Sequence, residues 1–138
     1  MDLIIESVDY APNELYGQVP LRISLLREIP GPDRPDYWIG AAVIPIQWIE
    51  NNLEKEITHV VLAARWVGTR IEPGVQHLPV GIAYVTDPSL LEDQQLDFKK
   101  CRYIAIGLSH DSSRHKMRSE KRSILSGRIT RAFGKGQE

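Results

Sequence analysis

The stretch ITHVVLAARWVGTRI, residues 57–71, is the longest apolar run of the chain, and its first eleven residues, 57–67, predict a central β-strand. Successive side chains of a strand point to opposite faces. One face would carry Val61 and Ala63, and the other Val60, Leu62 and Ala64, so neither face is polar through the middle. A strand that is apolar on both faces has to be covered on both. We therefore expect it inside a two-sided sheet, a barrel or a sandwich.

The segments on either side predict an antiparallel sheet with two short helices. Strand patterns occur at residues 19–29, 37–44, 78–86 and 103–108, with a short candidate at residues 3–5. Apolar residues recur at helical spacing after Pro45 and predict an amphipathic helix over residues 45–55. Asp87 followed by Pro88 predicts the start of a second helix, which would run to about Leu96. The connection after residue 67 is too short for a crossover, so the two strands that it joins should be antiparallel.

These elements make the chain an α+β protein with about five strands, and a small barrel, open or closed, is the leading variant. Residues 1–110 would form one domain, and residues 111–138 a basic tail with a short amphipathic helix. With 138 residues, 42% of them hydrophobic and 25% charged, the chain resembles an ordinary globular domain. The one cysteine, Cys101, cannot form an intrachain disulfide, and the first residues lack a signal-peptide pattern, so we expect a cytoplasmic protein. No apolar run is long enough to predict a membrane span.

The charges are divided unevenly along the chain. Residues 1–113 hold 9 Lys or Arg against 16 Asp or Glu, whereas residues 114–138 hold 8 against 2. The tail would therefore contact something acidic outside the protein, or fold back on an acidic body, its own or a neighbour's. Apolar residues, from Ile124 to Phe133, share one side of a predicted tail helix, and arginines flank that side. The candidate partner-binding surface consists of Arg122, Leu125, Arg128, Ile129, Arg131 and Phe133.

Small side chains recur in the predicted strands. Gly81 and Ala83 would face the same way on one strand, Ala105 and Gly107 on the last strand, and Ala63 or Ala64 lies mid-strand in the central one. Small residues on a sheet face permit a close approach, by a helix of the same protein, by a twin subunit or by a flat ligand. Packing within the protein is the commoner reason for such a row.

An arginine within the apolar run suggests an anion site. Arg65 stays charged and should find a carboxylate partner or lay its stem along apolar surface. Alternatively, Arg65 and Arg70 would bind a carboxylate or phosphate, with Trp66 as a stacking face and His77 and Glu72 nearby. The histidines show none of the compact spacings of a metal site, so we predict neither a metal nor a cofactor. Ser109, His110 and Asp111 are adjacent, whereas a catalytic triad needs groups from separate elements.

No stretch matches a catalytic motif, and the chain is expected not to be an enzyme. We predict a non-catalytic protein-interaction or assembly module that binds protein, a second copy included, through its apolar sheet surface and its basic tail. One alternative is a small enzyme or ligand-binding protein for an anionic substrate at Arg65 and Arg70. Another is a nucleic-acid accessory protein that neutralises phosphates through the tail, although the acidic body would oppose that contact.

Overall fold

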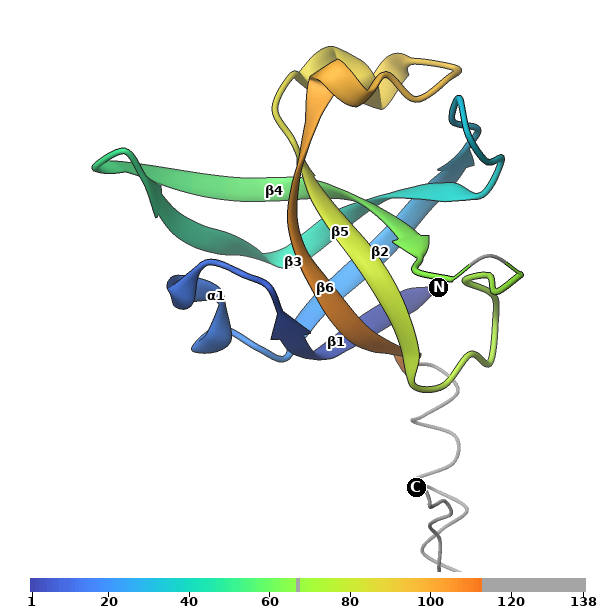
Figure 1. Ribbon diagram of the computed structural model, residues 1–138, viewed down its shortest axis with the longest axis horizontal. Coiled ribbons are helices and arrows are strands. Elements are labelled where there is room, and N and C mark those ends of the chain that lie inside the picture. The colour runs from blue at the N-terminus through green and yellow to red at the C-terminus, as the bar shows by residue number, and fades with distance from the viewer. Residues whose placement is uncertain (67, 113–138) are drawn as a thin grey trace, which may run out of the picture.

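The computed structural model of the protein describes residues 1–66 and 68–112. Six antiparallel strands pair in sequence order, and the last pairs with the first to close a barrel (Figure 1). They are β1 (Asp2–Asp9), β2 (Leu21–Ile29), β3 (Tyr37–Glu50), β4 (Leu53–Ala64), β5 (Leu78–Val85) and β6 (Cys101–Asp111). The antiparallel sheet and its small-barrel variant are confirmed. The expected strand count and the pair of helices are not, and the β content makes this a β-barrel protein.

The barrel interior is filled by aliphatic side chains from every strand. Leu3, Ile5, Ile23, Val60 and Val80 are among its fully buried residues. The central strand predicted at residues 57–67 is β4, whose inner face packs into this core through Val60 and Leu62. Its outer face is covered as well, because Val61 packs in a second apolar cluster outside the barrel. β4 is thus buried on its inner face and covered on its outer face at Val61, and it ends at Ala64, before the predicted end at residue 67. Val67 lies outside the described residues.

The second cluster is formed where the connection between β5 and β6, residues 86–100, folds over the outer wall. The predicted helix from Asp87 to Leu96 is here a 3₁₀ turn, η1 (Pro88–Glu92), followed by η2 (Phe98–Lys100). The Asp87 carboxylate accepts a hydrogen bond from the backbone N–H of Ser89, so the predicted cap is present on a shorter helix. Leu90 and Leu96 are buried beneath the connection against Ile29 and Ile39. The Leu96 N–H donates to the Pro30 carbonyl at 2.8 Å and ties the connection to the β2–β3 loop.

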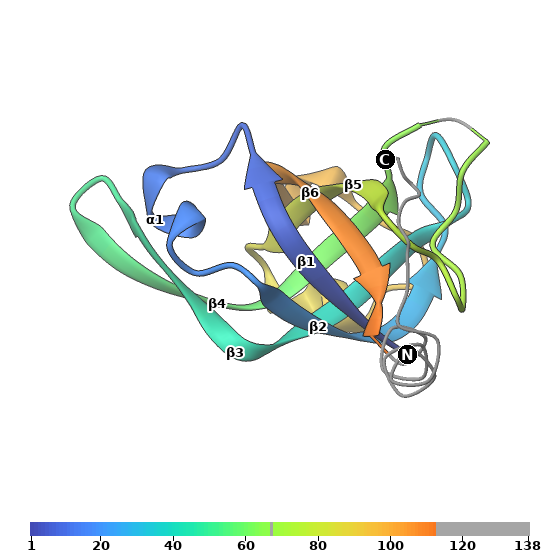
Figure 2. The same ribbon diagram turned by 90° about the horizontal axis from the view of Figure 1, so that it is seen from below.

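The amphipathic helix predicted over residues 45–55 is wrong, because this segment is the tip of the β3–β4 hairpin. Asn51 and Asn52 have φ of 52° and 64°, the left-handed pair that a two-residue type I′ turn requires. The apolar residues alternate along the strand, with Ile46 and Trp48 turned toward the core. The hairpin projects from the barrel as an arm, and the short helix α1 (Asn13–Tyr16) lies beneath it (Figures 1 and 2).

β6 ends at Asp111, next to the predicted boundary between domain and tail. The backbone N–H of Asp111 donates to the Val75 carbonyl at 2.8 Å, so the end of β6 lies against the β4–β5 loop. Within residues 1–66 and 68–112, the helices are all too short and too polar to cross a membrane.

Candidate functional site

A groove runs along the outer wall of the barrel over β4, β5 and β6. The strand register places Ala63, Gly81 and Ile106 in one row across these strands. Val61, Ala83 and Tyr103 form the adjacent row. Four of these six side chains are no larger than valine, so the wall is hollowed here rather than ridged. The space has a volume of about 410 Å³.

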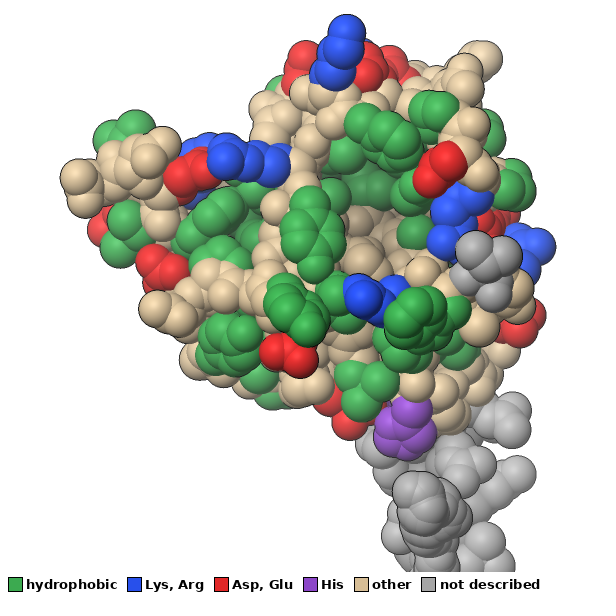
Figure 3. All heavy atoms as spheres, in the orientation of Figure 1, with side chains coloured by type: hydrophobic (Ala, Val, Ile, Leu, Met, Phe, Trp, Pro, Cys, Tyr) green, Lys and Arg blue, Asp and Glu red, His purple; other side chains and the backbone are tan. Residues whose placement is uncertain are grey.

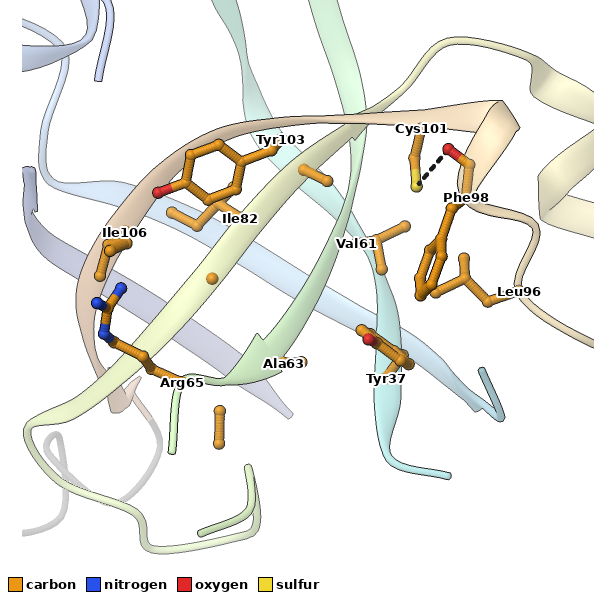
Figure 4. A pocket seen from close by; sticks show the side chains of 13 residues that line it. Tyr37, Val61, Ala63, Arg65, Ile82, Leu96, Phe98, Cys101, Tyr103 and Ile106 are labelled. Atoms are coloured by element: carbon orange, nitrogen blue, oxygen red, sulfur yellow. Dashed lines mark hydrogen bonds between the residues drawn. The ribbon is translucent and has the colours of Figure 1, made fainter. Parts of the chain in front are cut away.

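Aromatic side chains form the walls of the groove. Tyr37 from β3 and Phe98 from η2 meet edge to face with ring centroids 5.9 Å apart. Tyr103 from β6 stands on the other side, and Figure 4 shows the small floor residues between these rings. Phe98 is 48% and Tyr103 is 56% exposed, and Figure 3 shows hydrophobic side chains gathered on this face of the barrel. An exposed apolar patch with aromatic walls is typical of an interaction surface.

The predicted row of small residues is only partly present on this face. Ala63, Gly81 and Ala83 meet on the outer wall as one floor. Ala105 is fully buried inside the barrel, and a Cβ at Gly107 would lie 2.6 Å from a methyl carbon of Ile5. The pairing of β5 with β6 shifts by one residue between Ile82 and Ala83, so the two strands alternate differently along the wall. This bulge cannot be read from either strand alone.

Arg65 and Trp66 lie at one end of the groove, directly after β4. The Arg65 guanidinium lies over the Trp66 ring at 4.8 Å from its centroid. Both side chains are exposed, and Trp66 is 56% accessible. Arg65 thus follows the strand instead of being buried in it, and its exposed guanidinium stacks on the Trp66 ring. Arg65 was expected either to pair with a carboxylate or to lay its stem along apolar surface with its charge exposed. The exposed side chain fits the second expectation, and within the described residues Arg65 makes no ion pair.

Three arginines converge on a polar hollow beside this end. Arg65 and Arg70 line it together with Arg34, Asp33 and Asp36. Arg70 pairs with Glu28 at 3.0 Å, and its side chain is 58% exposed. The structure therefore brings Arg65, Trp66 and Arg70 to the same end of the barrel, although Arg70 already has a carboxylate partner.

Arg34 organises the backbone of the same hollow. Its guanidinium donates to both carboxylate oxygens of Asp36, at 2.6 and 2.9 Å, and to the carbonyls of Ala64 and Thr69. The hydrogen bond from Arg34 lowers the pKa of Asp36 below its ordinary value, and the same bond raises the pKa of Arg34. Burial and the hydrogen bond to Asp33 raise the pKa of Tyr37, whose hydroxyl donates to that carboxylate. This network fixes the β2–β3 loop against the end of β4.

His77 and Glu72 do not line the hollow that the arginines form. His77 has a left-handed φ of 52°, and its Nδ1 lies 3.6 Å from a carboxylate oxygen of Glu6. The same oxygen lies 2.6 Å from Nδ1 of His110, so β1, β6 and the β4–β5 loop meet at one carboxylate. Glu72 is exposed and its carbonyl accepts a hydrogen bond from the Val75 N–H. The sequence missed the Glu6 cluster, because its members are far apart in the chain and share no motif.

The sequence did not predict the aromatic walls either. Phe98 and Tyr103 lie on different elements, and only the fold of residues 86–100 brings them to Tyr37. Tyr103 opened the strand predicted at residues 103–108, but regular alternation would place it on the same face as Ala105, which is buried inside the barrel. Phe98 lies outside the predicted strands.

Cys101 lines the groove at the opposite end from Arg65 (Figure 4). Its Sγ donates to the Phe98 carbonyl over 3.9 Å. Burial, and after it the nearby Asp97 carboxylate, raise the pKa of the thiol. Lys99 and Lys100, which precede Cys101 in the sequence, therefore do not lower the pKa of its thiol.

The predicted tail residues Arg122, Leu125, Arg128, Ile129, Arg131 and Phe133 lie outside the described residues. Within the part of the chain that the structure describes, no group of three or more His, Cys, Asp or Glu side chains is arranged to hold a metal ion. Comparisons of the chain with protein-family models, with curated proteins and with solved structures found no match.

Proposed function

We propose that this protein is a non-catalytic protein-interaction module that binds an amphipathic, positively charged protein segment in the groove over β4, β5 and β6. The observation that carries the proposal is the combination of a floor of small side chains with exposed aromatic walls at Tyr37, Phe98 and Tyr103. Aromatic side chains supply large contact areas at a small entropic cost and are enriched where proteins bind one another.

The shape of the groove suits a rod-like partner more than a small molecule. Ala63, Gly81 and Ala83 let a backbone approach the sheet closely, because their side chains are small. An amphipathic helix laid into an apolar groove is a recurring mode of recognition. The negative balance of residues 1–113 favours a partner of positive charge.

A groove-filling substitution tests this proposal. A Cβ at Gly81 would meet nothing closer than the Ala63 carbonyl at 4.0 Å, so Gly81→Val fills the floor without a clash. Gly17→Val is the matched control, because a Cβ there meets nothing within 4 Å and the site lies beyond β1. Proteins cross-linked to the full chain should be lost with Gly81→Val and kept with Gly17→Val. The same set retained by both variants, or none by either, contradicts the proposal.

A second copy is the partner that the sequence predicted, and that prediction stands untested. Light scattering of the full chain and of a chain ending at Asp111 tests it. A larger mass for the full chain alone would support assembly through the tail. Monomers in both, with an unchanged set of partners, would contradict both assembly and the role of the tail.

The alternative function is the binding of a small anion in the hollow of Arg34, Arg65 and Arg70. The observation that favours it is the convergence of three guanidiniums on one hollow. Arg34 and Arg70 already have carboxylate partners, so the hollow offers less free charge than the count implies. Thermal stabilisation by phosphates, nucleotides or carboxylic acids that disappears in Arg65→Met with Arg70→Met would support it. Equal stabilisation in that variant would exclude these two arginines as the ligands.

A further inference from the structure

We propose that the protein's own segment 113–138 folds back and covers the groove, so that an external partner has to displace it. The proposal rests on the groove being a protein-binding surface. In this proposal the segment of the same molecule occupies the groove. An external partner therefore competes with the segment for the groove. Three features support it: the place where the segment leaves the barrel, the match of lengths, and the charges.

The segment begins beyond the Arg65 end of the groove. Ile106 marks that end on β6, and Ser112 follows six residues later, about 20 Å along an extended chain. The apolar stripe of the segment begins at Ile124. The intervening residues 113–123 reach up to about 37 Å when extended. This connection is long enough for the chain to turn and return to the groove.

The stripe and the groove have similar lengths. Ile124 to Phe133 would span about 14 Å as a helix. The wall of the groove on β6, from Cys101 to Ile106, spans about 17 Å as a strand. At helical spacing, Leu125 and Ile129 lie at the centre of the apolar side, and Ser123 and Thr130 lie on the opposite side. A floor of small residues can accept the two central side chains.

The charges of the two parts are complementary. The turns and loops of residues 86–100, at the Cys101 end of the groove, carry four carboxylates against two basic residues: Asp87, Glu92, Asp93 and Asp97 against Lys99 and Lys100. Running back from the Arg65 end, the segment would bring Arg128, Arg131 and Lys135 toward these loops. Glu120, which precedes the stripe, would arrive near Arg65. Since a short tether gives an effective concentration in the millimolar range, weak contacts are enough to close the groove within one molecule.

The native Cys101 reports whether the groove is covered, because it is the one cysteine of the chain and lines the groove. The rate of its reaction with a disulfide reagent such as DTNB is compared in the full chain and in a chain ending at Ser112. All six strands and the pairing of β1 with β6 lie within residues 1–112, and circular dichroism checks that the shorter chain is folded. If the segment covers the groove about 90% of the time, its removal should raise the rate about tenfold.

Paired substitutions in the full chain separate the stripe from the charge. Leu125→Asp with Ile129→Asp should raise the labelling rate as truncation does. Ser123→Asp with Thr130→Asp changes the net charge equally on the opposite side, and should leave the rate near that of the full chain. A synthetic peptide of residues 113–138, added to the shorter chain, should slow its labelling again.

Each result decides the proposal. Equal rates in the full and shortened chains overturn it, yet leave the groove open as a binding surface for the cross-linking test of Gly81→Val. Equal effects of the two paired substitutions would show that charge, not the stripe, covers Cys101. Labelling of the full chain should not depend on protein concentration. A rate that falls as concentration rises would mean that the segment of another copy covers the groove, which contradicts the intramolecular contact.

Discussion

The two faces of β4 and β5 are built differently although the strands are the same. On the inner face, Val60, Leu62 and Val80 are fully buried among the aliphatic side chains of a closed barrel. On the outer face, Ala63, Gly81 and Ala83 leave a hollow between partly exposed aromatic rings. The inner face carries large side chains that fill the barrel. The outer face carries small side chains, and no other element of the described chain covers it along the groove. The inner face carries the packing that stabilises the barrel, and the outer face is where we propose that the protein binds a partner.

The largest effect is expected on the inner face. Leu62→Ala should lower the free energy of unfolding by about 3 kcal/mol, because it leaves a cavity in a fully buried site. Tyr103→Ala, on the outer face of β6, should cost less than about 1 kcal/mol, because the ring is more than half exposed. Chemical denaturation of both variants measures the difference. A larger loss for Tyr103→Ala would show that the outer face is part of the core.

The next effect is expected where the connection 86–100 covers the outer wall. Leu90→Ala should cost about 2 kcal/mol, since Leu90 is buried but belongs to a small cluster that can partly collapse. The loss should loosen residues 86–100 before the barrel unfolds, which hydrogen exchange detects as faster exchange of the Leu96 N–H. Uniformly faster exchange through β1 to β6 would instead make this cluster a part of the global core.

Asp36→Asn should cost about 2 kcal/mol at pH 7, because it breaks a two-bond pair in which the carboxylate is mostly buried. The pKa of Asp36 is lowered in the folded state, so the ionised pair contributes its full stability above the unfolded pKa of about 4. That contribution is lost as the pH falls through the folded pKa. The difference in free energy of unfolding between the parent protein and Asp36→Asn should therefore shrink below about pH 4.

Asp33→Asn is the control for this pH effect. It retains an acceptor for the Tyr37 hydroxyl and removes no paired charge, so its cost should be below about 1 kcal/mol. Urea midpoints at pH 7 and pH 3 test both variants. If the loss of stability caused by Asp36→Asn were the same at pH 7 and pH 3, the ion pair of Arg34 and Asp36 would add no net electrostatic stability.

The smallest change in stability is expected at the groove floor. Gly81→Val should alter the free energy of unfolding by no more than about 0.5 kcal/mol, because the strand gains a β-branched residue where the added atoms find room. It should nevertheless prevent any segment from lying in the groove. The Tm measures the effect on stability, and cross-linking measures the effect on binding. A large loss of stability would show that the outer wall is already tightly packed.

The sequence was most informative where the periodicity was unambiguous. The apolar run at residues 57–67 predicted a strand covered on both faces, and β4 is that strand. The three prolines and one glycine at residues 30–35 excluded a regular element and mark the loop between β2 and β3. Asp87 was predicted as a helix cap and is one, although the helix that it caps is a single 3₁₀ turn.

The sequence failed where two patterns overlapped. Ile46, Ile49 and Leu53 fit helical spacing, and the Asn51–Asn52 turn that breaks this spacing is polar and looked like one side of the helix. A type I′ turn accepts asparagine at both positions, so the pair was the available signal for a hairpin. The groove was anticipated only as a row of small residues. Its position depended on the bulge between β5 and β6 and on the fold of residues 86–100, both of which arise from tertiary pairing.

The most direct test of the assignment of binding to the outer face is methyl NMR of the full chain and of a chain ending at Ser112. The account predicts that the largest shift differences fall on the outer-face methyl groups of Ala63 and Ala83, while Leu62 and Ala64 on the inner face stay unchanged. Unchanged signals of Ala63 and Ala83, or differences confined to the residues next to Ser112, would contradict the claim that this groove is where the protein binds its own segment.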